Sequence, residues 1–360
     1  MNEHGRYVYG IIQANERKSL GSIGLGDPKK EVYTVPYQDI SAVVSDSPII
    51  DYDSMTKDRV VKTLFSHQTV IEKVMENHTI IPVKFGTFAA DEEEVLQILK
   101  TGYRRFRETV NTMTDRIELD VVALWNKELI FKEIAEGSEI QESKKRIASN
   151  PADPQLEDRI RLGRMVERAL KKRNLECAEE ILCSLQEKAS DLSAHETLDD
   201  TMILNASFLL DRDREKDFDE KLNELDEKYE GKINFRCVGP LPPYSFSTVE
   251  VKKIGFETID KARRLLRLGE EASRSEVKSA HRKLVFECHP DKNPQGGPSD
   301  NKFNELTQAY KILLEYCQSD RCSLRKEDVK DSILINILRI AEAAERKKLE
   351  KINLCSRDPY

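Results

Sequence analysis

Residues 285–297 read VFECHPDKNPQGG, a stretch in which a helical segment ends in a histidine, a proline and an aspartate (289–291) before a loop rich in glycine and proline. Apolar residues recur at helical spacing before this stretch, in residues 273–287, and after it, in residues 301–316. Two helices with facing apolar sides and a connector of about ten residues pack as an antiparallel hairpin. We therefore predict a helical hairpin with the tripeptide at its tip.

The tripeptide has the properties of a small, rigid recognition element. Its proline fixes one backbone φ angle, and a preorganised group loses less conformational entropy on binding. The helix that precedes it adds a positively charged face. The predicted docking residues of this module are His289, Pro290, Asp291, Lys278, Arg282 and Lys283.

From about residue 257 to residue 316 the chain resembles a J-domain, the module by which DnaJ-type co-chaperones engage DnaK-type ATPases. The resemblance rests on SEVKSAHRKLVFECHPDKNP and KFNELTQAYKILL, which keep helix, tripeptide, loop and helix in order. It implies that the tripeptide stimulates ATP hydrolysis by a DnaK-type chaperone and that the basic helix docks on this partner. One departure is His281, where the family commonly has tyrosine.

Composition excludes several classes of partner. The 360 residues exceed one comfortable hydrophobic core, so two or three domains are expected. A net charge of -7 argues against nucleic acid or an anionic membrane as partner. We expect no signal peptide and no membrane helix. Seven scattered cysteines without metal-ligand spacing predict reduced thiols in a cytoplasmic protein, with no metal and no cofactor.

The upstream residues alternate between strand and helix patterns. Residues 1–126 are predicted as one α/β domain and residues 127–250 as a second. Short runs rich in β-branched and aromatic residues predict strands, and apolar residues at helical spacing predict helices. The predicted strands are 7–12, 31–37, 40–46, 79–88, 117–125, 201–211 and 233–239, and the predicted helices are 54–76, 91–113, 150–190 and 213–231.

This upstream region, from about residue 5 to residue 248, is similar to the GvpL/GvpF family of gas vesicle proteins. The similarity rests on six motifs in unbroken order: YVYGII, HQTVIEKVMENHTIIPVKFGTF, IELDVVALW, RLGRMVERAL, ILNASFLLDRDREKDF and VGPLPPYSF. It implies two α/β domains of a ferredoxin-like type. It also implies that the protein binds GvpA, the apolar shell subunit, and other gas vesicle proteins in the cytoplasm, in association with gas vesicles.

The expected fold class is therefore α+β. Two α/β domains precede an all-α J-domain at residues 256–320, and a tail at 321–360 follows. The tail is predicted as an amphipathic helix over residues 327–354, which either covers the J-domain or binds a partner. The connection between residues 246 and 257 is expected to be sensitive to proteases.

The most recognisable stretch of the first domain supplies a second candidate site. Its residues either form a surface for the shell subunit or serve folding alone, and periodicity does not decide between the two. These residues are Pro82, Lys84, Phe85 and Gly86.

No catalytic constellation is evident, so the leading hypothesis is an assembly adaptor that joins the shell subunit to a chaperone. The alternative is an enzyme or ligand-binding protein regulated by its J-domain. Its site would use the glycines of loop 21–26, whose spacing favours a hairpin loop over a phosphate loop, or the polar region around His195. His67 is expected to be a hydrogen-bonded structural histidine.

Overall fold

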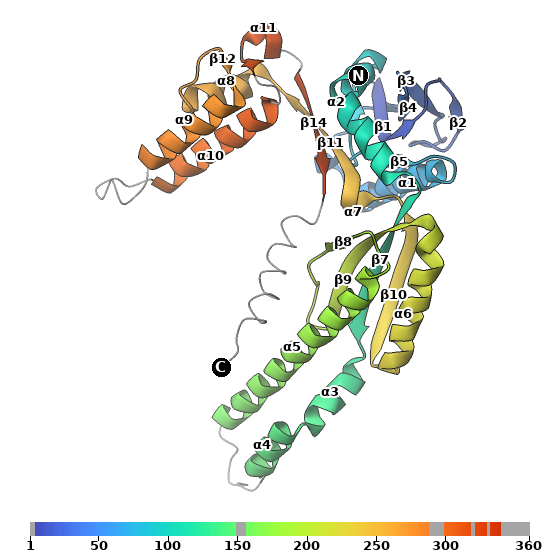
Figure 1. Ribbon diagram of the computed structural model, residues 1–360, viewed down its shortest axis with the longest axis vertical. Coiled ribbons are helices and arrows are strands. Elements are labelled where there is room, and N and C mark those ends of the chain that lie inside the picture. The colour runs from blue at the N-terminus through green and yellow to red at the C-terminus, as the bar shows by residue number, and fades with distance from the viewer. Residues whose placement is uncertain (1–3, 149–155, 288–298, 318–320, 330–331, 340–360) are drawn as a thin grey trace.

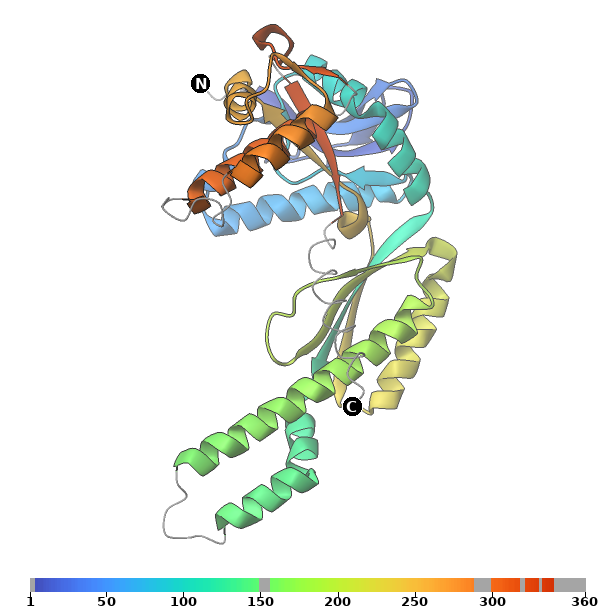
Figure 2. The ribbon, with the colours of Figure 1, turned by 60° about the vertical axis from the view of Figure 1, so that its left-hand side comes forward.

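The computed structural model describes residues 4–148, 156–287, 299–317, 321–329 and 332–339. The chain forms two sheet domains, one above the other in Figure 1, and a helical module lies beside the first. Helices extend the second domain away from the first, so that the molecule is elongated in the views of Figures 1 and 2. The tripeptide 289–291 lies outside the described residues.

The first domain is an antiparallel sheet covered by one helix on each face. Its strand order is β2-β3-β4-β1-β5, and β6 also pairs with β1. Helix α1 (Lys57–Met75) packs on one face, and helix α2 (Glu92–Met113) packs on the other. The strands are β1 (His4–Gln13), β2 (Ser19–Gly21), β3 (Val32–Tyr37), β4 (Ile40–Pro48), β5 (Ile80–Pro82) and β6 (Phe88–Ala89).

The predicted elements of this domain form because their patterns match the observed faces. Val70, Ile71 and Val74 of α1 are buried against β1, and Asp91 caps α2 by accepting a hydrogen bond from the Glu94 N–H at 2.9 Å. Strands β2 and β3 pair antiparallel, so the glycine-rich residues between them form a hairpin loop, as predicted.

The second domain is a four-stranded antiparallel sheet of order β10-β7-β9-β8. Its buried residues form one cluster with the apolar sides of the long helix α5 and of α6. The elements are β7 (Arg116–Trp125), α3 (Lys127–Glu136), α4 (Ser138–Ala148), α5 (Leu156–Gln186), β8 (Asp191–Ala194), β9 (Met202–Asp211), α6 (Glu215–Tyr229) and β10 (Ile233–Leu241).

Strand β7 belongs to this second sheet, although the sequence assigned it to the first domain. It pairs with β9 along its whole length and with β10 on its other side. A strong strand pattern predicts a strand but not the sheet that it joins, because pairing is decided by distant residues.

The helical module contains α8 (Phe256–Leu265), α9 (Arg274–Glu287) and α10 (Ser299–Tyr316), which share one buried core. Two short elements extend it: the paired strands β12 (Glu271–Ala272) and β13 (Cys322–Ser323), and helix α11 (Lys326–Val329). Helices α9 and α10 lie side by side, as the predicted hairpin requires.

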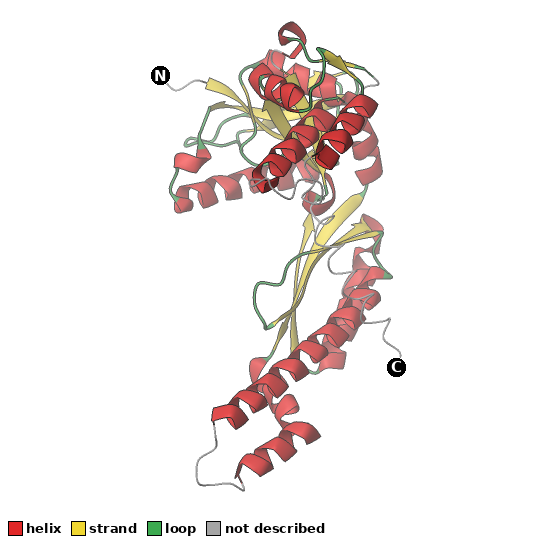
Figure 3. Ribbon diagram, turned by 90° about the vertical axis from the view of Figure 1, so that its left-hand side faces the viewer, coloured by secondary structure: helices red, strands yellow, loops and turns green. Residues whose placement is uncertain are grey.

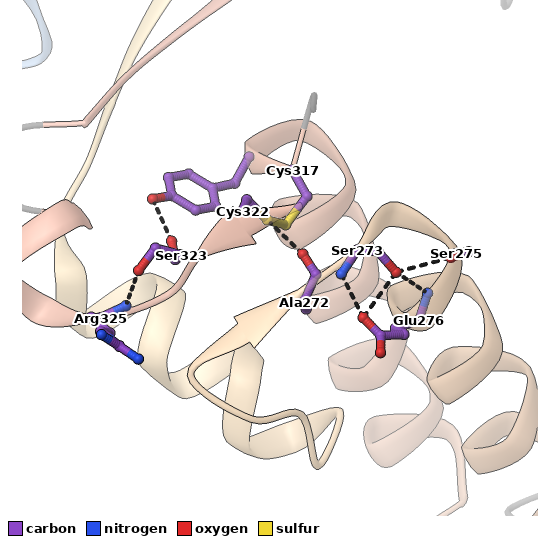
Figure 4. The surroundings of a disulfide bond; sticks show 9 residues. Ala272, Ser273, Ser275, Glu276, Cys317, Cys322, Ser323 and Arg325 are labelled. Carbon is purple, nitrogen blue, oxygen red and sulfur yellow. Dashed lines mark hydrogen bonds between the residues drawn. A yellow bond between two sulfur atoms is a disulfide. The ribbon is translucent and has the colours of Figure 1, made fainter. Parts of the chain in front are cut away.

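Cys317, at the end of α10, forms a disulfide with Cys322 of β13, where the sequence predicted reduced thiols. Figure 4 shows this bond above the start of α9, where the Cys322 Sγ lies 3.2 Å from the carbonyl oxygen of Ala272. The disulfide was not predicted because the separation of the two cysteines, five residues, matches no metal-binding or redox motif. They meet because Cys322 lies in β13, which pairs with β12 next to the end of α10.

Two strands that the sequence did not predict join the helical module to the first domain. Strand β11 (Thr248–Ile254) leads into α8, and strand β14 (Ser332–Leu338) follows α11 and returns antiparallel to β11. We call this pair the ribbon. In Figure 3 the strands and helices of the upper part of the molecule form one continuous body.

The ribbon corrects two expectations. The predicted tail helix of residues 327–354 is wrong over Ser332–Leu338, which form β14, and residues 340–360 lie outside the described part of the chain. The expected exposed connection between residues 246 and 257 is largely strand β11, with Val249 fully buried. Ile333 and Ile335 join the core of the first domain on one face of β14, while Leu334 on the other face is also buried. An apolar run buried on both faces has no period that separates a strand from a helix.

Candidate functional site

The basic face of the helical module is exposed. Lys278, Arg282 and Lys283 of α9 are all exposed, whereas Val277 and Leu284 on the same helix are buried in the module's core. The three cations therefore lie on the solvent side of the hairpin that leads to the tripeptide. The other predicted docking residues, His289, Pro290 and Asp291, lie outside the described residues.

The start of α9 is fixed by a reciprocal capping arrangement, which Figure 4 shows. The Ser273 Oγ accepts a hydrogen bond from the Glu276 N–H at 3.1 Å, and the Glu276 carboxylate accepts from the Ser273 N–H at 2.7 Å. Further along the helix, the His281 ring stacks on Tyr310 of α10, with 4.2 Å between ring centroids. His281 therefore fills an aromatic position between the two helices.

The second candidate site is a turn after β5, residues 82–86, and most of it serves the fold. Pro82 is buried, and Phe85 is half-buried against the ring of Tyr52, with 4.6 Å between centroids. Gly86 has a φ of 83°, and a Cβ there would lie 3.2 Å from Tyr52. We call residues 82–86 the turn.

Lys84 is the exposed member of the turn, and the ribbon engages it. Its N–H donates to the carbonyl oxygen of Val249 at 2.8 Å, and its ammonium group lies 2.8 Å from the Glu250 carboxylate. Glu250 also pairs with Lys252 at 3.0 Å, and Lys252 lies 3.7 Å from Glu315 of α10. The turn is thus in direct contact with the strand that leads into the helical module.

A buried aromatic network joins two of the sequence motifs beneath the turn. The Tyr7 hydroxyl lies 2.9 Å from Nδ1 of His67 and accepts a hydrogen bond from the Gly86 N–H at 3.1 Å. Burial lowers the pKa of His67 to about 4 and raises that of Tyr7. His67 is therefore neutral at physiological pH, and it has the structural, hydrogen-bonded role that the sequence predicted.

A second buried network joins the two sheet domains. Glu118 of β7 is 1% exposed and accepts two hydrogen bonds from Ser245, one from its N–H at 2.8 Å and one from its hydroxyl at 2.7 Å. Ser245 belongs to the short helix α7 (Tyr244–Ser247), which leads into β11. Burial, reinforced by the neighbouring Asp120 carboxylate, raises the pKa of Glu118 to about 8.

The polar chain continues from Ser245 across the second sheet. The Ser207 hydroxyl donates to Asp120 and lies 3.0 Å from the Ser245 hydroxyl, while the His195 Nε2 lies 2.8 Å from Ser207. Serine, histidine and carboxylate are present, but the carboxylate contacts the serine instead of orienting the histidine, and Ser207 is fully buried. This network therefore links elements of the fold and presents no accessible nucleophile.

Neither a cluster of metal ligands nor a membrane-spanning helix is found among the described residues. Within them, no group of three or more His, Cys, Asp or Glu side chains is arranged to hold a metal ion. Asp199, near His195, is occupied by hydrogen bonds from Thr201. Across the described helices, none is long and apolar enough to span a membrane.

Sequence reasoning did not identify the junction of Glu118 with Ser245 or the contact of Lys84 with Glu250. The sequence did contain a sign of the Glu118–Ser245 junction, because Glu118, Ser207 and Ser245 are polar residues within three of the quoted motifs. Nothing in the sequence indicated the contact of Lys84 with Glu250, because 166 residues separate the two partners.

Two family models match the chain. The model described as gas vesicle synthesis protein GvpL/GvpF matches residues 5–248, and the DnaJ domain model matches residues 264–318. Both predicted resemblances are thereby confirmed. Residues 249–254 of β11 and all of β14 lie outside both matches.

Individual relatives agree with the first match. Gas vesicle protein F of Streptomyces sp. (strain CB03234) is 28% identical over 244 residues, which cover 67% of this chain and 98% of that protein. Gas vesicle protein F1 of Halobacterium salinarum is 25% identical over 252 residues, covering 68% and 93%. The crystal structure of GvpF from Anabaena sp. PCC7120 matches with a TM-score of 0.56 at 22% identity, covering 67% of this chain and 97% of that one, which supports the mixed α/β fold of the upstream region.

Proposed function

Because the chain belongs to the GvpL/GvpF family of gas vesicle synthesis proteins and contains a DnaJ domain, we propose that it is an assembly adaptor. In this function it binds the shell subunit GvpA and recruits a DnaK-type chaperone to it. Other gas vesicle proteins are its further partners, and it acts in the cytoplasm in association with gas vesicles. It is not an enzyme, and it needs no cofactor, nucleic acid or membrane.

The observation that carries the proposal is the way in which the J-domain is joined to the family domain. Strand β11 runs from the junction helix α7 into α8, and β14 returns into the core of the first domain. An apolar subunit bound to the first domain would therefore be presented at a fixed distance from a chaperone bound to the J-domain. Linking two binding sites in one chain raises their effective concentration, to about millimolar for short flexible links.

The proposed binding surfaces differ in chemistry. On the J-domain, the exposed cations of α9 support docking of a chaperone with an acidic surface, together with the tripeptide at positions 289–291. On the first domain, Lys84 and the exposed part of Phe85 are the accessible members of the turn. Pro82 and Gly86 shape the turn, so their contribution to shell-subunit binding is through its conformation.

A three-component capture experiment tests the adaptor. Tagged GvpA is immobilised and incubated with a DnaK-type chaperone and ATP, with and without this protein. We expect the chaperone to be retained only when this protein is present. The variant Asp291→Asn is expected to remain bound to GvpA while the chaperone is lost.

A matched pair of charge variants sharpens this test. Lys278→Glu with Arg282→Glu is expected to reduce chaperone capture, whereas Lys261→Glu, at an exposed position on α8, is expected to leave it unchanged. Retention of the chaperone by Asp291→Asn, or no binding of GvpA by the intact protein, would refute the proposed function.

A further inference from the structure

Helix α1 exposes an apolar stripe on its first half. Val61, Leu64 and Phe65 have 63%, 44% and 71% of their surfaces exposed. Residues three and four apart lie on one side of a helix, so these three form a continuous strip. Leu64 lies three residues before His67, so the strip adjoins the side that α1 buries against the sheet, which consists of His67, Val70, Ile71 and Val74. We call Val61, Leu64 and Phe65 the α1 stripe.

The start of α1 carries more cations than carboxylates. The first two turns of α1 contain three exposed cations, Lys57, Arg59 and Lys62, and one carboxylate, Asp58. This local excess of cations contrasts with the net charge of -7 of the whole chain. A partner that covers the stripe is favoured if it brings carboxylates beside an apolar surface. A second copy of α1 would bring cations against cations, which disfavours self-association through this surface.

The α1 stripe is continuous with the turn. The Phe85 ring contacts the ring of His67 at 5.6 Å between centroids, and His67 lies one helical turn after Leu64. Phe85 also contacts Tyr52, which precedes α1. A partner that covers the exposed part of Phe85 therefore reaches the stripe along one surface of the first domain.

We propose that the α1 stripe docks an amphipathic helix whose apolar face is bordered by carboxylates, and that the gas vesicle shell subunit supplies this helix. An exposed aromatic anchor with apolar residues at i, i+3 and i+4 is the arrangement by which helices recognise apolar partners. This inference rests on the proposed function and names the residues by which it recognises the subunit.

The test compares exposed aromatic positions. The double variant Leu64→Ser with Phe65→Ser is compared with Phe131→Ser, since Phe131 of α3 is 48% exposed on the other sheet domain. The readout is the Kd for tagged GvpA, with the thermal midpoint measured in parallel. We expect at least a tenfold weaker Kd for the double variant, no change for Phe131→Ser, and unchanged midpoints. Stimulation of the chaperone's ATPase without GvpA should also be unchanged.

Charge reversal tests the second part of the proposal. Lys57→Glu with Lys62→Glu should weaken GvpA binding and reduce its dependence on salt, whereas Lys216→Glu on α6 should not. Equal binding by the stripe variant and the wild type would overturn the inference while leaving the adaptor function intact. The stripe variant could instead change its oligomeric state, or lose binding to anionic phosphatidylserine vesicles, while its GvpA binding stays unaltered. Either result would show that the stripe binds another partner and would overturn the inference. No GvpA binding by the wild type would instead refute the proposed function.

Discussion

At the scale of single residues, the polar positions of the family motifs form two buried networks. Tyr7, His67 and Gly86 meet under the turn, and Glu118 and Ser245 meet at the junction of the two sheet domains. Each polar group in these networks has a hydrogen-bond partner, as buried polar groups require. Sequence spacing predicted the structural role of His67, whereas the partners of Glu118 come from strands and a helix far apart in the chain.

Glu118 makes the stability of the protein depend on pH. Its folded-state pKa of about 8 lies above the ordinary value of 4.5, so the folded protein binds this proton more tightly than the unfolded chain. Its contribution to the free energy of unfolding is therefore complete below about pH 4.5 and declines as the pH rises towards 8. The slope in this window approaches about 1.4 kcal/mol per pH unit.

Denaturation in urea at several pH values between about 5 and 9 measures this effect, because linkage places the decline in stability between the unfolded and folded pKa values of Glu118. Glu118→Gln keeps an acceptor for the Ser245 N–H and cannot ionise, so we expect a flatter pH profile and greater relative stability at high pH. Glu220→Gln, at an exposed position of α6, is the control. An unchanged profile in Glu118→Gln would mean that Glu118 does not titrate in this range.

Tyr7 tests the network under the turn. Tyr7→Phe removes the hydroxyl that pairs with His67 and accepts from the Gly86 N–H, leaving both partners without it. We expect a loss of about 1–3 kcal/mol in the free energy of unfolding. Tyr33→Phe, which removes an exposed hydroxyl bound to Asp46, should cost clearly less. Equal losses would show that the buried network contributes nothing beyond a surface hydrogen bond.

At the scale of elements, periodicity predicted the long helices and most of the strands of the two sheets. It failed at the ribbon for a physical reason. Residues 332–338, SILINIL, place Ile333 and Ile335 in the core of the first domain, and Leu334 on the other face is also buried. Such a run fits a helix as well as a strand until its neighbours are known. Strand β11 was missed because its charged residues resemble those of a linker.

The ribbon is expected to be part of the first domain's core. Ile335 is 2% exposed, so Ile335→Ala should lower the free energy of unfolding by roughly 2–5 kcal/mol, whereas Ile49→Ala, at a 40% exposed site, should have little effect. Thermal denaturation followed by circular dichroism measures both. A loss for Ile335→Ala no larger than that for Ile49→Ala would show that β14 is only loosely attached.

Limited proteolysis gives an independent test of the same element. The sequence alone predicted cleavage between residues 246 and 257, but Val249 is buried in the ribbon. The wild-type chain should therefore resist cleavage there, and Ile335→Ala should become sensitive. Rapid release of the J-domain from the wild type would contradict the ribbon as described.

At the scale of the whole molecule, the two resemblances in the sequence predicted that one chain combines a gas vesicle protein with a J-domain. They did not predict how the two modules are joined. The ion pairs from Lys84 through Glu250 and Lys252 to Glu315 follow the surface from the turn to α10. Exposed pairs of this kind contribute only about 0–1 kcal/mol each. The fixed position of the J-domain therefore depends mainly on the buried residues of the ribbon.

The most direct test of the adaptor is the steady-state ATPase rate of a DnaK-type chaperone in the presence of this protein, with and without GvpA. We predict that the intact protein stimulates hydrolysis, that GvpA increases the stimulation, and that His289→Gln and Asp291→Asn each abolish it while GvpA binding persists. The same rate with and without the intact protein, at concentrations where both partners are bound, would contradict the central claim that this chain couples a gas vesicle subunit to a chaperone.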